Sequence, residues 1–529
     1  MTAEKKISRR EYLKVAGAGV VGLGVGAAIG YGVTSFLMPE KIKEVPVPTP
    51  IQTIQGATVA ERAINGAKEL VESGKVPEGT EIPVLCPSGL AAAIDIVKTE
   101  WENATGTKPV AIGVPEAEMY EKPLLEAVAK TGQYAAYLNR PWMLGELVEA
   151  NAIIELDDLI KIGDPRLEGM PDGFAYPLVK QYTWYRGHLY SLPLDGDTWI
   201  AYYRKDLLED PTEKENFERE YGYPLKIPET MEEYRDVVEF FTRPDQQLYG
   251  QNEPRYKVNC HSSFYWRLAN KKYPCMLPFD DDMHPTVNSP EGLKAAKQFL
   301  ELVPFMDPAI TNFSYGEHCN YFATGHAFAA VTFPSFGKYA EAANAVTRGK
   351  VVYALPPGEV VEGPTGPIIN RRTMQGGGWT YMVSRWYKYP ELAYFFGQFL
   401  TSPEWIVNVS IAPGSWADPI RYNQLGPFAD PRQYEAFRKE EIDTLYTAAM
   451  TAIPLLCIRK AAEYHKVVYE TMHGVQARAL AGEDIDSLAS EAVQTIANEW
   501  EDITEREGRE EMKISWQFHK QTYPMGMIT

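Results

Sequence analysis

Two carboxylates, Asp195 and Asp197, stand two positions apart in the apolar stretch that begins at Leu192. Glycoside hydrolysis needs a pair of carboxylates, so an exported hydrolase could use one of them with another acid such as Glu317. No second acid has a setting that identifies it as a catalytic partner. The chain after residue 56 also contains no GxSxG elbow, Walker loop or Cys/His nucleophile motif. The sequence therefore predicts a protein without enzymatic activity.

The cysteines and histidines form no metal-binding pattern. The 5 cysteines include no CxxC pair, and the 8 histidines include no HExxH. Asp280, Asp281 and Asp282 lack the spacing and the final Glu of a calcium loop, which favours a solvated acidic turn. A GxGxxG at residues 17–22 has no preceding strand and lies in an apolar run, so it does not indicate a dinucleotide site. We predict neither a metal nor a cofactor.

Composition and charge describe a large, folded, acidic chain. With 529 residues it exceeds the ~150 residues of one typical domain, so more than one core is expected. Its net charge of −19 would repel nucleic acid and anionic membrane surfaces, and no nucleic-acid partner is predicted. Neutral and cationic ligands are compatible with this charge. The 11 Trp and 32 Tyr supply flat apolar platforms of the kind that a sugar binder requires.

The N-terminus resembles a twin-arginine (Tat) export signal, with Arg9 and Arg10 before an apolar run. Residues 15–37 carry no charge and would span roughly 35 Å as a helix, enough to cross a bilayer of ~30 Å. We predict that residues 1–37 act as signal and retained anchor, with cleavage as the alternative, and that residues 38–56 form a Pro/Thr-rich stalk. The body would then be extracellular or periplasmic.

Hydrophobic patterns predict an alternation of strands and helices after the stalk. Strands are expected at 82–89, 109–114 and 135–138, and helices at 117–131 and 142–149. A further helix is expected after the first strand, because Ile94, Val97, Lys98 and Trp101 recur at helical spacing and Gly106 stops it. This order is typical of a parallel α/β unit. The C-terminal third is expected to be mostly helical, with an N-cap at Asp486 and helix breaks at Gly474 and Gly482.

Four stretches resemble motifs of the extracellular solute-binding proteins of ABC importers, family 1, which includes the maltose-binding and other sugar-binding proteins. They are WENATGTKPV (101–110), LPLDGDTWIAYYRKD (192–206), YFATGHAFAAV (321–331) and GGGWTYMVSRWYKYPELAYFFGQFLTSPE (376–404). The last is the most specific. The resemblance covers most of residues 80–500, and the extra length suggests insertions near 205–228 and 245–285.

The resemblance implies an α/β, two-lobed periplasmic-binding-protein-like fold of type II. Crossing segments form the hinge between the lobes, and the C-terminal lobe is rich in helices. By analogy with the family's chain path, residues 57–195 and 375–415 form lobe 1, and residues 196–374 and 416–529 form lobe 2. Hinges are expected near Pro193 to Asp197 and near Gly376 to Gly378, where small residues can absorb backbone rotation.

The same resemblance places candidate ligand-binding residues on the loops that face the cleft between the lobes. They are Ser88, Gly89, Tyr137, Asn139, Arg140, Trp142, Asp195, Asp197, Trp199, Phe336, Gly378, Trp379 and Trp416. Several have equally good structural interpretations: Asp195 and Asp197 as the caps of a hinge turn, and Ser88 with Gly89 as an ordinary helix start. An acidic sugar would become plausible if Arg371 and Arg372 pointed into the cleft.

The function that the resemblance implies is the exported binding component of an ABC importer. It would capture a carbohydrate, by preference a neutral oligosaccharide, and deliver it to the permease subunits as a monomer. A peptide or polyamine ligand is the alternative within this class. Cys260 and Cys275 lie 15 residues apart in a predicted insertion outside the cell, and we expect them to form a disulfide.

Overall fold

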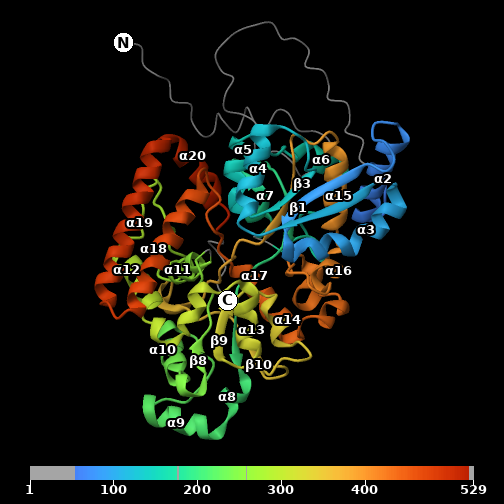
Figure 1. Ribbon diagram of the computed structural model, residues 1–529. Coiled ribbons are helices and arrows are strands. Elements are labelled where there is room, and N and C mark those ends of the chain that lie inside the picture. Colours follow the sequence, from blue (N-terminus) through green and yellow to red (C-terminus); the bar gives the residue numbers. More distant parts are fainter. Residues whose placement is uncertain (1–53, 176–177, 258, 524–529) are drawn as a thin grey trace, which may run out of the picture. The chain divides into compact units, whose positions relative to one another are not determined.

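The computed structural model describes residues 54–175, 178–257 and 259–523 (Figure 1). The predicted export signal, the anchor and the stalk up to residue 53 lie outside the described residues. Within the described part of the chain, no helix has the length and apolar character needed to cross a membrane.

The first sheet combines strands from the N-terminal third of the chain with two later strands. Its order is β2 (Lys108–Val114), β1 (Glu81–Pro87), β3 (Ala136–Asn139), β13 (Trp379–Val383) and β6 (Leu192–Asp195). β1 pairs in parallel with β2 and β3, whereas β13 runs antiparallel to β3 and β6. The predicted strand–helix–strand unit is confirmed. Its helix α3 (Ala91–Thr105) ends at Gly106, whose φ of 71° suits glycine.

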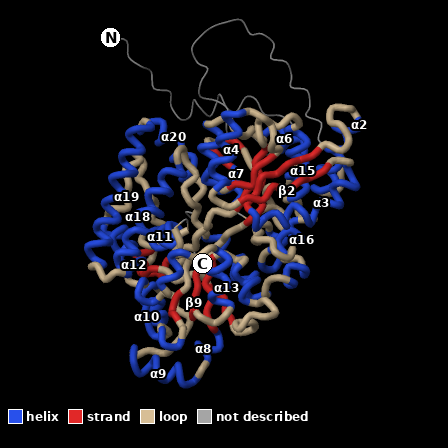
Figure 2. The backbone as a smooth tube through the Cα atoms, viewed as in Figure 1, coloured by secondary structure: helices blue, strands red, loops and turns tan. Residues whose placement is uncertain are grey.

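The second sheet has four strands, and Figure 2 shows its strands as a group apart from the first. Its order is β10 (Val351–Ala354), β7 (Ile200–Arg204), β9 (Ala327–Thr332) and β8 (Tyr249–Gln251). β7 is antiparallel to β10 and β9, and β8 is parallel to β9. We call the part of the chain around the five-stranded sheet the first lobe and the part around the four-stranded sheet the second lobe. The residue boundaries given for the lobes above stay a prediction.

Helices surround both sheets, and two short hairpins complete the described structure. The first lobe includes α2 (Val59–Glu72), α3, α4 (Glu118–Ala129), α5 (Leu144–Glu149), α6 (Asp157–Gly163), α15 (Pro390–Leu400) and α16 (Ile406–Ile411). The remaining helices are α7 (Leu178–Thr183), α8 (Lys205–Glu209), α9 (Pro211–Tyr221), α10 (Met231–Phe240), α11 (Cys260–Ala269), α12 (Pro290–Leu300), α13 (Tyr315–Ala323), α14 (Phe336–Ala340), α17 (Lys439–Thr451), α18 (Ala461–Leu480), α19 (Ile485–Glu507) and α20 (Arg509–Lys520). The hairpins pair β4 (Trp184–Tyr185) with β5 (His188–Leu189) and β11 (Glu359–Gly363) with β12 (Gly366–Asn370).

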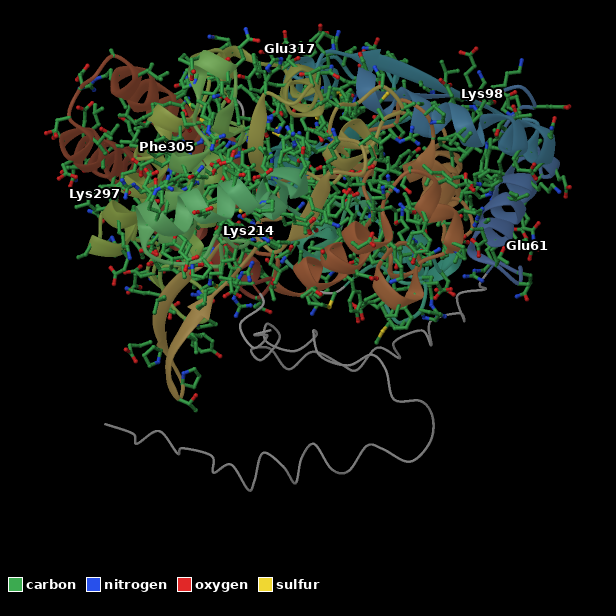
Figure 3. The ribbon with its side chains drawn as sticks, turned by 90° about the horizontal axis from the view of Figure 1, so that it is seen from below. Glu61, Lys98, Lys214, Lys297, Phe305 and Glu317 are labelled. Carbon is green, nitrogen blue, oxygen red and sulfur yellow. The ribbon has the colours of Figure 1, made fainter. Side chains whose placement is uncertain are left out.

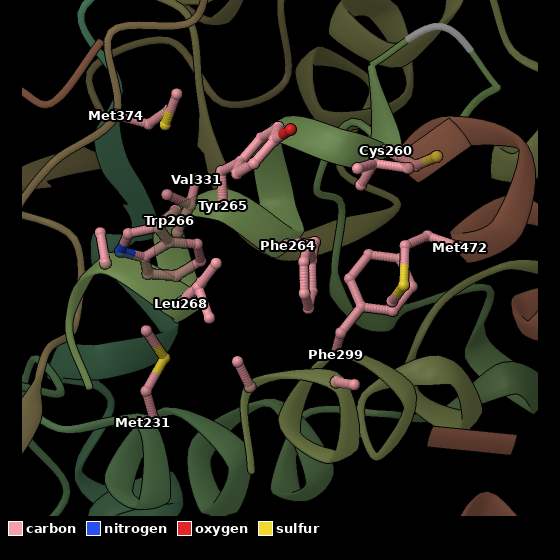
Figure 4. Packing of buried hydrophobic residues seen from close by; sticks show 14 of the residues in the cluster. Met231, Cys260, Phe264, Tyr265, Trp266, Leu268, Phe299, Val331, Met374 and Met472 are labelled. Carbon is pink, nitrogen blue, oxygen red and sulfur yellow. The ribbon is translucent and has the colours of Figure 1, made fainter. Parts of the chain in front are cut away.

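Each sheet has its own hydrophobic core. In the first lobe Trp101 packs against Phe396 and Phe399 of α15, with ring centroids 5.3 and 5.2 Å apart. In the second lobe α11 is buried along its whole length, and Figure 4 shows Phe264 close to Phe299 and Met472. Burying such a side chain fully contributes about 1.5–3 kcal/mol relative to leaving it exposed. The expectation of more than one core is therefore confirmed.

Segments that pass between the two sheets pair with one another. The apolar stretch from Leu192 to Tyr203 divides into β6 and β7, which lie in different sheets. Trp199 N donates to Met374 O at 2.8 Å, and Gly376 N donates to Asp197 O at 2.8 Å. Gln375 N donates to Ile453 O at 2.8 Å, which adds the segment before α18. The predicted hinge positions lie at these crossings, and their motion stays a prediction.

Two predictions on the C-terminal helices need correction. The N-cap of α19 is Asp484, whose side chain accepts from Ser487 N, so the prediction of Asp486 is wrong by one half-turn. Gly474 lies inside α18 rather than at a break, because the packing of a 20-residue helix outweighs the cost of one glycine. Gly482 does follow the end of α18, with a φ of 91°.

The predicted disulfide is also wrong. Cys260 begins α11, and its thiol lies 3.3 Å from Lys257 O and 3.4 Å from Tyr469 O. Met276 N donates to Ala269 O, so Cys275 stands beside the opposite end of the helix. Nine residues of α-helix separate these ends by roughly 14 Å, well beyond the ~7 Å between Cα atoms that a disulfide tolerates. Burial raises the pKa of Cys260 to about 12 and of Cys275 to about 11, which keeps both thiols protonated.

Candidate functional site

Strand ends of both sheets meet at one cavity. β3 and β6 end at Asn139 and Asp195, and β9 ends just before Phe333. In α/β sheets ligands bind outside the carboxyl ends of the strands. The residues that line the cavity are Glu116, Arg140, Asp195, Asp197, Tyr256, Asn259, Tyr315, Phe333, Ser335, Trp379 and Trp416. Its volume of about 30 Å³ holds one or two water molecules.

Arg140 is the central cation of the site. It follows β3, where its backbone N–H donates to Asn139 Oδ1 at 2.8 Å. Its guanidinium donates to Asp197 Oδ2 and to Glu116 Oε1, both at 2.8 Å, and lies 4.2 Å above the ring of Trp379. Burial alone would lower the pKa of Arg140, but the two carboxylates raise it well above its ordinary value. The guanidinium is therefore charged and held rigidly by its partners.

Asp197 occupies a tight turn between β6 and β7. Its φ of 39° lies in the left-handed region, which Asp tolerates better than most residues. Besides Arg140, its Oδ2 accepts from Gly378 N at 2.8 Å. Gly378 has a φ of 41°, and a Cβ there would lie 2.2 Å from the hydroxyl oxygen of Tyr182. The turn thus joins the two predicted hinge segments through one carboxylate.

Asp195 lines the cavity and Asp418 contacts it from behind the lining, and we call this pair the floor of the site. Asp195 Oδ1 accepts from Asp418 N at 2.7 Å, and neither side-chain oxygen of Asp418 accepts a hydrogen bond from any residue that the structure describes. With Asp197, these carboxylates bring one oxygen each to within 4.8 Å of one another. Lys338 lies near them, but its Nζ donates to Ser415 O at 2.9 Å and Ala417 O at 3.0 Å.

The electrostatics of the floor disfavour ionised carboxylates. Burial, followed by the charge of Asp197, raises the pKa of Asp195 well above its ordinary value. Burial and the charge of Asp195 do the same for Asp418. For Asp197 burial raises the pKa, and Arg140 opposes the shift. The three acids therefore differ: Asp197 has Arg140 as a cationic partner, whereas no cation in the part of the chain that the structure describes forms an ion pair with Asp195 or Asp418.

Aromatic rings form the walls. Trp379 starts β13, and Trp416 follows α16. Tyr315 meets Trp416 edge-to-face at 5.7 Å and Phe333 at 5.5 Å. The ring of Trp416 lies so close to Gly89 that a Cβ there would be 2.0 Å from it, which explains the glycine. Sugars stack their C–H faces on such rings.

Among the residues proposed from the sequence, Arg140, Asp195, Asp197, Trp379 and Trp416 line the cavity. Gly89 and Gly378 support it, as described above. The other predicted residues support the surrounding structure: Ser88 donates to Val114 O, Tyr137 shares a hydrogen bond with Ser384, Asn139 donates to Met119 O, Trp142 packs on Tyr120 and His465, and Trp199 and Phe336 lie fully buried in the core. Phe333, three positions earlier, takes the place in the cavity wall that was predicted for Phe336.

Sequence reasoning missed Asp418 and six residues of the lining. These six are Glu116, Tyr256, Asn259, Tyr315, Phe333 and Ser335. Glu116 follows β2 just as Arg140 follows β3, so the strand-end rule gave a signal for it. Phe333 and Ser335 follow β9 in the same way. Tyr256 and Asn259 lie between β8 and α11, in a region interpreted as an insertion.

Three other charged candidates lie elsewhere. Arg371 donates to Leu355 O and Pro356 O, and Arg372 donates to Pro274 O, so neither lines the cavity. Glu317 caps α13 by accepting from Ser314 N, and Figure 3 shows it at the edge of the molecule. These positions support neither an acidic-sugar site formed by Arg371 and Arg372 nor a catalytic pair that includes Glu317.

The comparisons with known proteins agree on a family and a fold. The model of the family "Bacterial extracellular solute-binding protein" matches residues 87–406, more than half of the chain. A maltotriose-binding protein of Pyrococcus abyssi is 25% identical over 167 residues, which cover 31% of this chain and 30% of that protein. The aligned region thus spans less than a third of this relative's length.

Solved structures resemble this chain over most of its length. An ABC transporter solute-binding protein from Agrobacterium radiobacter, in complex with ribitol, has a TM-score of 0.64 and 20% identity, covering 80% of this chain and 99% of that one. Maltose-bound MalE3 of T. maritima has a TM-score of 0.64 and 18% identity, covering 80% and 100%. A cyclo/maltodextrin-binding protein complexed with maltotetraose has a TM-score of 0.56 and 18% identity. The predicted two-lobed α/β fold of type II is confirmed.

Proposed function

The chain belongs to the bacterial extracellular solute-binding protein family, and from this premise we propose that it is the binding component of an ABC importer. It captures a carbohydrate, by preference an oligosaccharide, in the cavity between the two lobes and delivers it to the permease subunits. The maltotriose-binding protein, the maltose-bound protein and the maltodextrin-binding protein in complex with maltotetraose support this ligand class.

One observation carries the proposal: both lobes supply aromatic rings and polar groups to the same cavity. The first lobe contributes Arg140 and Trp379, and the second contributes Tyr315, Phe333 and Ser335. A sugar needs flat apolar surfaces for its ring faces and rigid polar groups for its hydroxyls. Because these groups come from two lobes, a ligand that contacts both favours the closed arrangement.

Capture requires a change in the separation of the lobes. A cavity of about 30 Å³ is far smaller than a sugar ring, so entry needs an opening between the lobes. The segments around Asp197 and Gly378 are the places where that rotation would occur, since both already use left-handed backbone. The permease would recognise the closed, ligand-bound form.

Proteins of an extracellular family are exported, which agrees with the Tat-like N-terminus. We further propose that residues 1–37 anchor the protein, that residues 38–56 form a spacer, and that the protein acts as a monomer. A glycoside hydrolase is not favoured, because Glu317 caps a helix and offers no partner to Asp195 or Asp197. The proposed role therefore involves no turnover of the ligand.

The test is a titration of the full chain with mono- and oligosaccharides, following tryptophan fluorescence and melting temperature together. We expect a saturable response to one sugar class, and loss of this response in Trp379→Ala and Asp197→Ala. Trp405→Ala is the matched control, because Trp405 packs on Phe399 outside the cavity. A response only to peptides would overturn the ligand class, and release of shortened sugars would overturn the binding role.

A further inference from the structure

The cleft has more acidic than basic side chains in and directly behind its lining. Four carboxylates lie in or directly behind its lining: Glu116, Asp195, Asp197 and Asp418. The cations beside them are Arg140 and Lys338. Arg140 is committed to Glu116 and Asp197, and Lys338 gives two of its three N–H bonds to backbone carbonyls. Asp195 and Asp418 are thus the two of these acids that no Lys or Arg of the described residues contacts.

Asp418 is the most exceptional of them. It is fully buried, and both of its side-chain oxygens lack a hydrogen-bond donor among the residues that the structure describes. A buried carboxylate without partners is costly, and native proteins rarely retain one without a reason. Asp195 and Asp197 line the cavity, and one oxygen of each lies within 4.8 Å of an oxygen of Asp418. A ligand group that binds between these oxygens would therefore interact with Asp418 as well.

The walls around this floor are suited to a cation. Tyr256, Tyr315, Phe333, Trp379 and Trp416 line the same cavity. The faces of aromatic rings are electron-rich and attract ammonium and guanidinium groups. Arg140 already uses the face of Trp379 in this way, with its guanidinium 4.2 Å from the ring centre.

We propose that the ligand of this cleft carries a protonated amino group that binds the carboxylates of Asp195 and Asp418, which makes an amino sugar its substrate class. This inference rests on the proposed function. An ammonium group has three donors and no acceptor, so it matches carboxylates whose acceptor sites are unused. The raised pKa values of both acids agree with a missing positive charge. A calcium ion would instead require six to eight oxygen ligands, whereas five of the eleven lining residues are aromatic.

The test compares sugars that differ at one substituent. Glucosamine and its β-1,4 dimer and trimer are titrated by calorimetry against glucose, cellobiose and cellotriose, and against the N-acetylated forms. We expect the amino sugars to bind at least tenfold more tightly than both neutral series. In Asp418→Asn, which keeps the shape but removes the charge, this preference should disappear. Asp157→Asn, an acidic residue of α6 that does not line the cavity, is the control that should keep it.

The outcomes separate this inference from the proposed function. Binding of neutral sugars as tight as that of amino sugars would overturn the inference and leave the carbohydrate role intact. Binding of spermidine but of no sugar, weakened by Asp418→Asn, would overturn both the amino-sugar inference and the carbohydrate role in favour of a polyamine ligand. A rise in melting temperature with Ca²⁺ that EDTA reverses and Asp418→Asn abolishes would overturn the inference in favour of a metal site. Silence across the whole panel from protein with a cooperative melting transition would overturn both.

Discussion

Two clusters of buried charge in this protein have opposite electrostatics. In the second lobe Glu253 accepts from Arg267 at 2.7 and 3.0 Å and from Arg255 at 3.1 Å, and all three side chains are fully buried. In the cleft, Asp195 and Asp418 are buried to the same degree, yet Asp418 accepts no hydrogen bond from any described residue. Both clusters are buried, but Glu253 accepts hydrogen bonds from two arginines, whereas Asp418 has no such donor among the described residues.

The difference appears in the pKa values. Burial acts to raise the pKa of Glu253, but the two arginines outweigh it and lower the pKa below its usual range. At Asp195 and Asp418 no contacting cation opposes burial, so their pKa values rise. Burial alone therefore does not decide whether a charge cluster stabilises the fold. We interpret the Glu253 cluster as part of the core and the Asp418 cluster as a site kept ready for a ligand.

The largest predicted effect breaks the compensated cluster. Glu253→Gln leaves Arg255 and Arg267 without their common carboxylate, and removing one partner of a buried ion pair costs about 3–5 kcal/mol. We expect the free energy of unfolding, measured with urea at pH 7, to fall by that amount. Ligand affinity of the molecules that remain folded should not change. A loss below about 1 kcal/mol would mean that the arginines are adequately solvated without Glu253, and the contrast with the cleft would disappear.

The next prediction addresses the uncompensated cluster. Asp418→Asn should not destabilise the protein at neutral pH and should stabilise it, since an unpaired buried group costs about 1–3 kcal/mol. Because the pKa of Asp418 is raised on folding, the wild type loses stability as pH rises above the unfolded value of ~3.9 towards the folded one. The charged groups that act on it are Asp195, Asp197, Lys338 and Glu441.

The measurement is urea unfolding of wild type and Asp418→Asn between pH 4.5 and 8. The stability of the variant relative to the wild type should grow with pH. A variant that is less stable than the wild type across the whole range would show that Asp418 is already compensated, which would remove the comparison between the two clusters.

The sequence predicted the scaffold better than the floor of the site. β1, α3 and β2 follow from local hydrophobic periodicity and a terminal glycine at 106, because those signals lie within a few residues. Asp197 and Trp379 were predicted because they stand in stretches that resemble the solute-binding family, and Arg140 because it follows the predicted strand at 135–138, in a loop that the resemblance places at the cleft. The strand ends then bring them together.

Asp418 could not be found in this way. Its hydrogen-bonded neighbour Asp195 is 223 positions earlier in the chain, and no local pattern carries such a contact. The resemblance pointed to Phe336, whereas Phe333 directly follows β9 and lines the cavity, because the position of a strand end decides which aromatic ring faces the cavity. The predicted disulfide failed for a related reason: separation along the chain does not show that a helix holds the two cysteines apart.

A smaller effect tests the aromatic wall. Trp416→Ala removes a ring that meets Tyr315 at the cavity, whereas Trp405→Ala removes a half-buried ring on Phe399. Stacking of this kind is worth roughly 0.5–1.5 kcal/mol, or about two- to tenfold in affinity. We expect Trp416→Ala alone to weaken sugar binding by that factor in a calorimetric titration. Equal weakening by both variants would indicate that the loss comes from general destabilisation.

The smallest effect belongs to a third acidic cluster, at the surface. Glu155, Asp157 and His188 also bring ligand atoms within 4.8 Å of one another, but His188 Nδ1 already lies 2.9 Å from Asp157 Oδ2 and its side chain is 47% exposed. The hydrogen bond with Asp157 raises the pKa of His188. The stabilisation from this hydrogen bond is present in full below the unfolded pKa of ~6.5 and is lost as pH rises through the folded value.

Asp157→Asn should therefore lower the free energy of unfolding by less than about 1 kcal/mol at pH 5.5 and leave it unchanged at pH 9. Urea unfolding at both values measures it, and a larger loss that persists at pH 9 would mean that Asp157 acts through its bond to Leu189 N instead. We thus expect substitution of Asp157 to lower the stability of the fold, as substitution of Glu253 does, but by a smaller amount, because its cluster is exposed. Among the three clusters, Asp418 is the acid whose substitution should stabilise the fold.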